Sequence, residues 1–337
     1  MMSTTEARGA ATTDFIPVAL SNFQVDSITN FDIYIRPVGT AAPVLYRHKN
    51  QPFSDSVRAR LVNNQIATVL IEGHEEAAYQ RYMERHLGDL LRDDRTDISV
   101  KSHIFYDTAR GLVRQVLEAP RSGDVLKRGS QLVEHTVEFM LREHAALENI
   151  MKIASFDYYT YTHSVNVFVF SLAMAQRLNL ASDALKPFAL GALLHDVGKG
   201  LIGQDIINRN GPLSPAEWEM MKMHPVYSDE ILHEQGVTDA LTLEVARHHH
   251  EKLTGRGYPD GLTPMDIPKC VRIATIADIF DALTTRRSYK DAMSSFSALT
   301  LMKNEMAEEL DGELFREFVL MVGHPSELPS ARPQTHH

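Results

Sequence analysis

The spacing of hydrophobic and polar positions changes near residue 100. Between residues 15 and 75, several short stretches are β-branched and aromatic or alternate with polar residues, a pattern typical of strands. These stretches are FDIYIR, PVLYR and IATVLI, at 31–36, 43–47 and 66–71. Residues 75–93 follow with the pattern of an amphipathic helix. We therefore expect a small α+β domain over residues 1–95, with a flexible lead at 1–14 and a role in sensing, docking or dimerisation left open.

Beyond residue 100, nearly every segment has the helical period. In 102–120 and 131–154, apolar residues recur at i, i+3, i+4 and i+7, which predicts linking helices over 96–150. The pattern continues through 151–325 and predicts an all-helical domain there, followed by a disordered tail at 326–337. The predicted fold class is therefore mainly α, with a small N-terminal α+β domain.

Two features of the helical part are more specific. Ser214, Pro215 and Glu217 predict a helix start with a capping box and a proline in the first turn. The stretch 250–268 is rich in glycine and proline and predicts one long loop. Long loops inside compact helical domains are usually functional.

Composition limits the class of partner. The chain has 337 residues, enough for two domains, and a formal net charge of −10, which argues against binding long nucleic acid. A local basic pocket for a small anion remains open. The single cysteine, Cys270, excludes an intrachain disulfide and favours a reducing, cytoplasmic compartment. No apolar run approaches the roughly 20 residues of a membrane span, and the polar start is not a signal peptide, so we expect no membrane insertion.

Histidines gather in the helical part. Seven of the 16 lie between residues 163 and 250: His163, His195, His224, His233, His248, His249 and His250. A single histidine on an apolar helix is more often a hydrogen-bonded core residue than a ligand. Several histidine-bearing core helices, together with Asp196 and Asp278, change this balance, because buried imidazoles and carboxylates all need partners.

The donor atoms narrow the choice of metal. Nitrogen and carboxylate oxygen without thiolate suit Fe, Mn, Zn, Co or Ni rather than Mg or Ca. Five histidines (His163, His195, His224, His249 and His250) and two aspartates are too many for one ion that keeps an open position. They suit two ions about 3.5–4 Å apart. We expect Asp196 to bridge them, because its neighbour His195 already anchors one ion.

Three motifs follow in order: HDVGKG at 195–200, HHE with Gly257-Tyr258-Pro259, and ADIFDALT at 277–284. This arrangement resembles the HD-GYP branch of the HD phosphohydrolases over roughly 150–325. The resemblance implies an HD-type helical catalytic domain and a bacterial phosphodiesterase that opens cyclic di-GMP to linear pGpG through a metal-activated hydroxide. Further cleavage to GMP is left open.

The resemblance also implies a role for each residue that matches. His163, His195, Asp196 and Asp278 match the ligands of one divalent ion, and Asp196, His224, His249 and His250 those of a second. Iron or manganese is expected first, with nickel, cobalt or zinc as alternatives. Lys199 matches a residue at the scissile phosphate, whereas His248 matches no ligand. Arg287 and Lys290 match positions that hold substrate phosphate, although by themselves they could be a solvated basic patch.

Some positions depart from the family pattern. Tyr159 stands where some members carry a glutamate that holds a third metal, so two ions are expected. Leu253, Thr254 and Arg256 replace common loop residues, which could alter substrate fit or partner docking.

Three other functions remain open. The first is hydrolysis of cyclic GMP-AMP. The second is a catalytically weak cyclic di-GMP receptor that signals through a partner protein. The third, an HD nucleotidase, is disfavoured by two features. One is the loop that contains Gly257-Tyr258-Pro259, called the GYP loop below, and the other is the basic pair Arg287 and Lys290. The GYP loop or the N-terminal domain could dock a protein, and a homodimer is possible.

Overall fold

The computed structural model describes residues 14–324, apart from 38, 41, 144, 155–161, 210 and 286–291. The chain forms two compact units, Met1–Leu90 and Leu91–His337. The expectations for the lead, the tail, Tyr159, Arg287 and Lys290 fall on residues outside this description.

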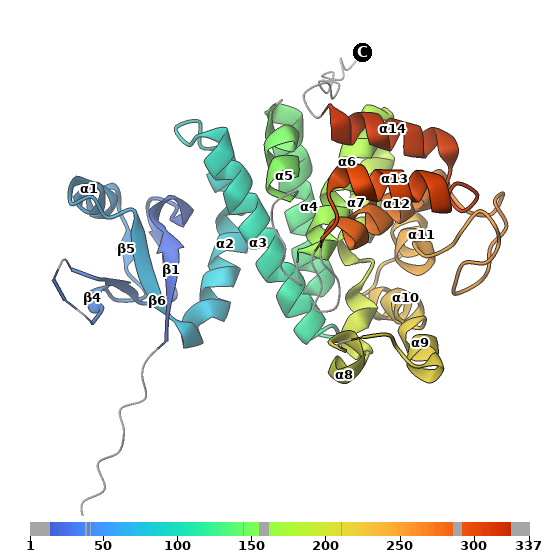
Figure 1. Ribbon diagram of the computed structural model, residues 1–337. Coiled ribbons are helices and arrows are strands. Elements are labelled where there is room, and N and C mark those ends of the chain that lie inside the picture. Colours follow the sequence, from blue (N-terminus) through green and yellow to red (C-terminus); the bar gives the residue numbers. More distant parts are fainter. Residues whose placement is uncertain are drawn as a thin grey trace, which may run out of the picture. The chain divides into compact units, whose positions relative to one another are not determined.

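The first unit contains a four-stranded antiparallel sheet with the strand order β1-β6-β3-β4. Figure 1 labels three of these strands, β1, β6 and β4. Its strands are β1 (Phe15–Ala19), β3 (Ile33–Ile35), β4 (Val44–Arg47) and β6 (Thr68–Glu72), and β2 (Ser27–Ile28) pairs with β5 (Pro52–Phe53). The predicted strands are therefore present. The 3₁₀ turns η1 (Leu20–Asn22) and η2 (Gly73–Glu75) lie at strand ends, and α2 (Glu76–Arg92) follows η2.

The pattern of the first unit did not predict one helix, α1 (Asp55–Asn63). Its start is capped by the Ser54 side chain, which accepts a hydrogen bond from the Val57 backbone N–H. The core of this unit is aromatic: Phe23 stacks on Phe53 with ring centroids 4.9 Å apart, and Tyr82 of α2 meets Phe31 edge to face. The unit is therefore α+β, as expected.

The second unit is helical. Its elements are α3 (Ile98–Glu118), α4 (Val125–Arg142), α5 (Ala146–Ala154), α6 (His163–Arg177), α7 (Ser182–Leu194), η3 (Val197–Leu201), α8 (Gln204–Ile207), α9 (Pro215–Met221), α10 (His224–Glu234), α11 (Ala240–His248), α12 (Lys269–Thr284), α13 (Ser295–Glu305) and α14 (Gly312–Gly323). The mainly helical fold class is confirmed. The capping box at Ser214 and Glu217 is formed, and the segment between α11 and α12 is the expected long loop. Within the described residues, no helix is both long and apolar enough to span a bilayer.

Helix α6 is the centre of this unit. Every residue from His163 to Ala175 is buried, because α5, α7, α12 and α14 all pack against it (Figure 1). A helix that is apolar on all sides belongs in a core. Its first residue, His163, therefore lies in the interior of the unit.

The turn after α7 lies very close to α10. A side chain at Gly198 would collide with the His224 carbonyl oxygen and the Ser228 backbone N. The Ser228 hydroxyl also bonds both sides of this turn: it accepts from the Gly198 N–H at 2.9 Å and donates to the His195 carbonyl at 2.6 Å. The absence of a Cβ and this hydroxyl together fix the turn that carries His195 and Asp196 against the helix that begins with His224.

Candidate metal centre

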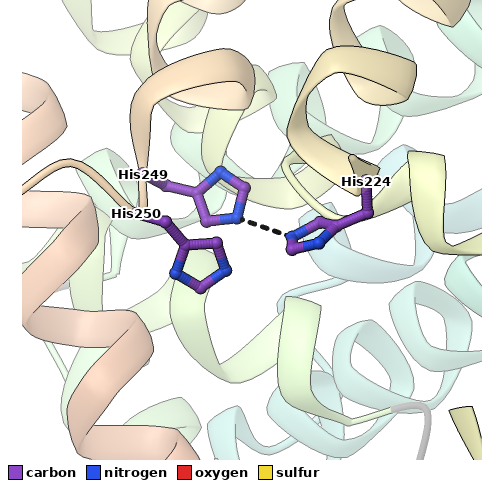
Figure 2. Close-up of side chains that lie close together, drawn as sticks. All are labelled: His224, His249 and His250. Atoms are coloured by element: carbon purple, nitrogen blue, oxygen red, sulfur yellow. Dashed lines mark hydrogen bonds between the residues drawn. The ribbon is translucent and has the colours of Figure 1, made fainter. Parts of the chain in front are cut away.

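The structure brings the seven predicted ligand residues together. They occupy the start of α6, the turn after α7, the start of α10, the turn after α11 and the middle of α12. They form three overlapping groups, and within each group the ligand atoms lie within 4.8 Å of one another: His224, His249 and His250; His163, His195 and Asp278; and His195, Asp196 and His249. Figure 2 shows the first group, with the rings of three side chains from two separate segments facing one another.

Asp196 lies between the two sides of the cluster. Its Oδ1 is 3.2 Å from His224 Nε2 and 3.8 Å from His249 Nε2. Its Oδ2 is 3.5 Å from His163 Nε2 and 3.4 Å from His195 Nε2. Each carboxylate oxygen therefore faces a different pair of imidazoles, which is the arrangement that a bridging ligand needs.

Three of the imidazoles are oriented by helix ends. The Nδ1–H of His195, His224 and His249 donates to the carbonyl three residues earlier, at Ala192, Met221 and Ala246, over 2.7–2.9 Å. These carbonyls lie in the last turns of α7, α9 and α11, where no intrahelical N–H is left to bond them. With Nδ1 protonated, each neutral ring presents an unprotonated Nε2 to the cluster.

His163 is oriented by a residue that is far away in the sequence. Its Nδ1–H donates to Asp281 Oδ2 at 2.6 Å, between residues 118 positions apart. Its Nε2 faces Asp278 Oδ1 at 3.0 Å. This is the common arrangement in which a carboxylate holds the far nitrogen of a metal-binding imidazole.

Several buried polar atoms at the cluster have no hydrogen-bond partner among the described residues: His163 Nε2, His195 Nε2 and Asp196 Oδ1. His224 Nε2 and His249 Nε2 face each other at 3.2 Å (Figure 2), although in these tautomers both carry lone pairs. Buried lone pairs that face one another without a shared proton repel, and a cation among them would satisfy all of them. The donor set therefore fits divalent metal ions.

The charges agree with this conclusion. Burial would raise the pKa of Asp196, but Lys199 and His195 beside it hold that pKa well below its ordinary value. Burial acts likewise on Asp278, but His163 and His250 hold its pKa well below the ordinary value. Both carboxylates are therefore ionised inside the protein and attract positive charge.

The imidazoles divide into two kinds. Burial lowers the pKa of His224, His249 and His250, that of His250 to about 3, so these rings are neutral near pH 7 and free to ligate. Burial also acts to lower the pKa of His163, but Asp278 and Asp281 raise it to about 9. The carboxylates that favour a proton on its Nε2 favour a metal ion there for the same electrostatic reason.

The GYP loop covers the His250 side of the cluster. Tyr258 stacks on His250 with ring centroids 4.7 Å apart and an interplanar angle of 29°. The buried Glu251 carboxylate holds the loop by accepting the backbone N–H groups of Asp260, Gly261 and Leu262 at 2.8, 2.9 and 3.1 Å. A Cβ at Gly257 would lie 2.5 Å from Glu251 Cα, so only glycine lets the loop pass this close.

The structure also shows the partners of three other residues that the sequence singles out, Lys199, His248 and Leu253. Lys199, expected at a phosphate, has its ammonium on Asp196 Oδ2 at 2.5 Å, with 23% of the side chain exposed. His248 pairs with Glu244 at 2.6 Å and Asp260 at 2.9 Å, so it holds the loop from outside the cluster. Leu253, one of the family departures, bonds through its backbone N–H to the Glu309 carbonyl.

Sequence reasoning assigned no role to Asp281, Asn166 or Glu251. Asp281 was detectable, because it follows Asp278 by three residues and so lies on the same face of α12. Glu251 follows the histidine pair directly, but its function depends on a loop that returns to it about ten residues later. The two side-chain partners of Asn166, Tyr106 and Asp281, lie 60 and 115 positions away, so no local pattern indicates its role.

Comparison with known proteins agrees with the fold and the cluster. Residues 130–314 match the family model described as HD domain. The chain belongs to the HD domain family. An HD-GYP protein from Bdellovibrio bacteriovorus has the same fold, with a TM-score of 0.64 and 20% identity, covering 92% of this chain and 100% of that one. The predicted membership in the wider HD family is confirmed, and so is the HD-type helical fold.

Two relatives extend the comparison. A cyclic di-GMP phosphodiesterase of Pseudomonas aeruginosa is 32% identical over 64% of this chain and 52% of its own length. A 3′3′-cGAMP-specific phosphodiesterase of Vibrio cholerae is 32% identical over 69% of this chain and 52% of its own length. The chain therefore spans about half the length of these relatives.

Proposed function

We propose that this protein is a metal-dependent phosphodiesterase that hydrolyses cyclic di-GMP to linear pGpG. The observation that carries the proposal is the buried cluster of five histidines and two aspartates, whose unpartnered nitrogen and oxygen atoms converge on one place. Relatives named as cyclic di-GMP phosphodiesterases support the choice of substrate.

In this proposal, one divalent ion is held by His163, His195, Asp196 and Asp278, and a second by Asp196, His224, His249 and His250. Two such ions, iron or manganese first, would make water nucleophilic at neutral pH and neutralise phosphate charge. The helix ends and Asp281 keep the imidazoles in the ligating tautomer. Lys199, partly exposed and already beside Asp196, would stabilise the charge that develops on the phosphate and the leaving oxygen. Arg287 and Lys290 would hold substrate phosphate.

The stacked Tyr258 and His250 rings add a wall to the site. Burial raises the pKa of the Tyr258 hydroxyl, and the charges of Asp278 and Asp196 raise it further, so the phenol stays neutral. We assign it a role in shaping the pocket and no role as a base.

A second candidate substrate is 3′3′-cyclic GMP-AMP. It is favoured by the Vibrio cholerae relative, which matches 69% of this chain. Two further parts of the proposal are a cytoplasmic site of action, consistent with the single buried cysteine, and a protein partner or second copy bound through the GYP loop or the N-terminal unit. Light scattering of the purified protein tests the second copy.

The decisive experiment is turnover by protein loaded separately with Fe²⁺ and Mn²⁺. We expect cyclic di-GMP to be converted to pGpG, with slower or no cleavage of cyclic GMP-AMP, and chelated protein to be inactive. Faster cleavage of cyclic GMP-AMP would move the assignment to the second candidate. Binding of cyclic di-GMP without turnover by any loaded form would leave a receptor as the function.

The basic pair is tested separately. Arg287→Ala and Lys290→Ala should each weaken cyclic di-GMP binding by about ten- to a hundredfold, the loss of one charged hydrogen bond, while metal content stays at the wild-type value. Unchanged affinity in both variants would show that the pair is only solvated surface.

A further inference from the structure

A chain of buried hydrogen bonds leads from α3 to the metal cluster. The Tyr106 hydroxyl donates to Asn166 Oδ1 at 2.6 Å, and Asn166 Nδ2 donates to Asp281 Oδ1 at 2.7 Å. Asp281 Oδ2 then accepts from His163 Nδ1 at 2.6 Å. Tyr106 and Asp281 are 2% exposed and Asn166 is fully buried, so water does not compete with these bonds.

The direction of each bond follows from the chemistry of the groups. A carboxylate can only accept, so the Asn166 amide must turn its NH₂ toward Asp281 and its oxygen toward Tyr106. The Tyr106 hydroxyl then has to donate to that oxygen, which fixes the amide orientation. Thr285 donates to the same Asp281 oxygen as Asn166, at 3.1 Å, so the other oxygen is left for His163.

We propose that Tyr106, acting through Asn166 and Asp281, is a positioning residue for His163. It locks the imidazole with its proton on Nδ1 and its Nε2 toward the cluster. Tyr106 lies on α3, ahead of the 130–314 segment that matches the HD family. The helix that precedes the family domain thus completes the metal centre. This inference rests on the proposed metal-binding role of His163.

The test is Tyr106→Phe, which removes only the hydroxyl. Tyr82→Phe is the control, because Tyr82 is equally buried and its hydroxyl is also hydrogen-bonded in the first unit, to Ser27 at 2.5 Å and to the Gln24 N–H at 2.9 Å. Both variants should lose thermal stability. The distinguishing readout is Co²⁺ affinity, measured by competition with a chromophoric chelator, together with the visible absorption of bound Co²⁺.

We expect Tyr106→Phe to weaken one Co²⁺ binding step by about three- to tenfold, the value of roughly one neutral hydrogen bond, and to alter the Co²⁺ spectrum. Asp281→Asn, one step nearer the ligand, should weaken it by about 10–100-fold. Tyr82→Phe should change neither the affinity nor the spectrum.

Wild-type Co²⁺ affinity and spectrum in Tyr106→Phe, whatever its loss of stability, would reduce Tyr106 to a packing role and overturn the inference. Wild-type protein that binds no Co²⁺ would overturn the proposed metal centre and this inference with it. The two failures are therefore distinguishable.

Discussion

Replacing Glu251 with glutamine should loosen the GYP loop while leaving every proposed metal ligand in place. The side chain is 2% exposed and its two oxygens accept three backbone N–H groups of the loop. Glutamine has the same shape but one carbonyl oxygen only. Whichever way the amide turns, its NH₂ faces at least one backbone N–H.

The magnitude follows from these contacts. A hydrogen bond to a charged acceptor contributes about 1.5–3 kcal/mol, and a buried donor left unbonded costs about 1–3 kcal/mol. One lost bond, with the others weakened by the loss of charge, should lower the free energy of unfolding of the helical unit by about 2–4 kcal/mol. With a urea dependence of roughly 2–3 kcal/mol per molar, the unfolding midpoint should fall by about 1 M.

The assay is urea unfolding followed by tryptophan fluorescence. Trp218 is the only tryptophan in the chain, and its ring lies 6.0 Å from that of Tyr258, so its emission reports on this unit and this loop. Glu219→Gln is the control, since that side chain is 69% exposed and should shift stability by less than about 0.5 kcal/mol. If Glu251→Gln and Glu219→Gln unfold at the same urea concentration, the Glu251 carboxylate does not hold the loop and the reasoning is wrong.

Three further perturbations address the site and its rim. Asp196→Asn should abolish turnover and remove at least about half of the bound metal while circular dichroism stays helical; wild-type metal content by elemental analysis would disprove its bridging role. Lys199→Met should slow single-turnover cleavage by about a hundredfold with little change in cyclic di-GMP affinity, and an equal loss in both would move Lys199 to substrate capture. Arg247, with His248, lowers the pKa of Asp260 to about 2, so the stabilisation by this carboxylate is complete above its unfolded pKa of about 4 and disappears as the pH falls toward 2. Because 38% of the Asp260 side chain is exposed, Asp260→Asn should cost only about 1 kcal/mol at pH 7, with the difference vanishing in acid; a cost in urea unfolding that does not change with pH would contradict this.

The parts of the site that were predictable lie where a local pattern marks them. The pairs His195-Asp196 and His249-His250 follow apolar helical segments. The capping box at Ser214 predicts the start of α9, which ends shortly before His224. Asp278 falls on an apolar helix, where a buried carboxylate needs a partner. In each case a few neighbouring residues carry the information.

The parts that were not predictable depend on distant partners. Residues 131–154 have one continuous helical pattern of apolar positions, yet α4 ends at Arg142 with Glu143 as its C-cap. No glycine or proline stands there to end the helix. There the Glu143 carboxylate pairs with the buried Lys101 ammonium of α3 at 3.1 Å, a tertiary requirement that overrides local propensity. Helix α1 was missed although Ser54, Val57 and Leu61 have the spacing of a capped amphipathic turn.

The way the imidazoles are oriented has a consequence for anyone who wishes to transplant the centre into another scaffold. His195, His224 and His249 each take their orientation from a carbonyl three residues earlier, so each can be moved as a short segment consisting of a helix end and the one to three residues that follow it. His163 cannot be moved in this way, because its support arrives from α12, which is itself held by Asn166 and, through it, by α3. A designer could copy these three supports as local sequence, but would have to rebuild the support of His163 as a junction of α3, α6 and α12.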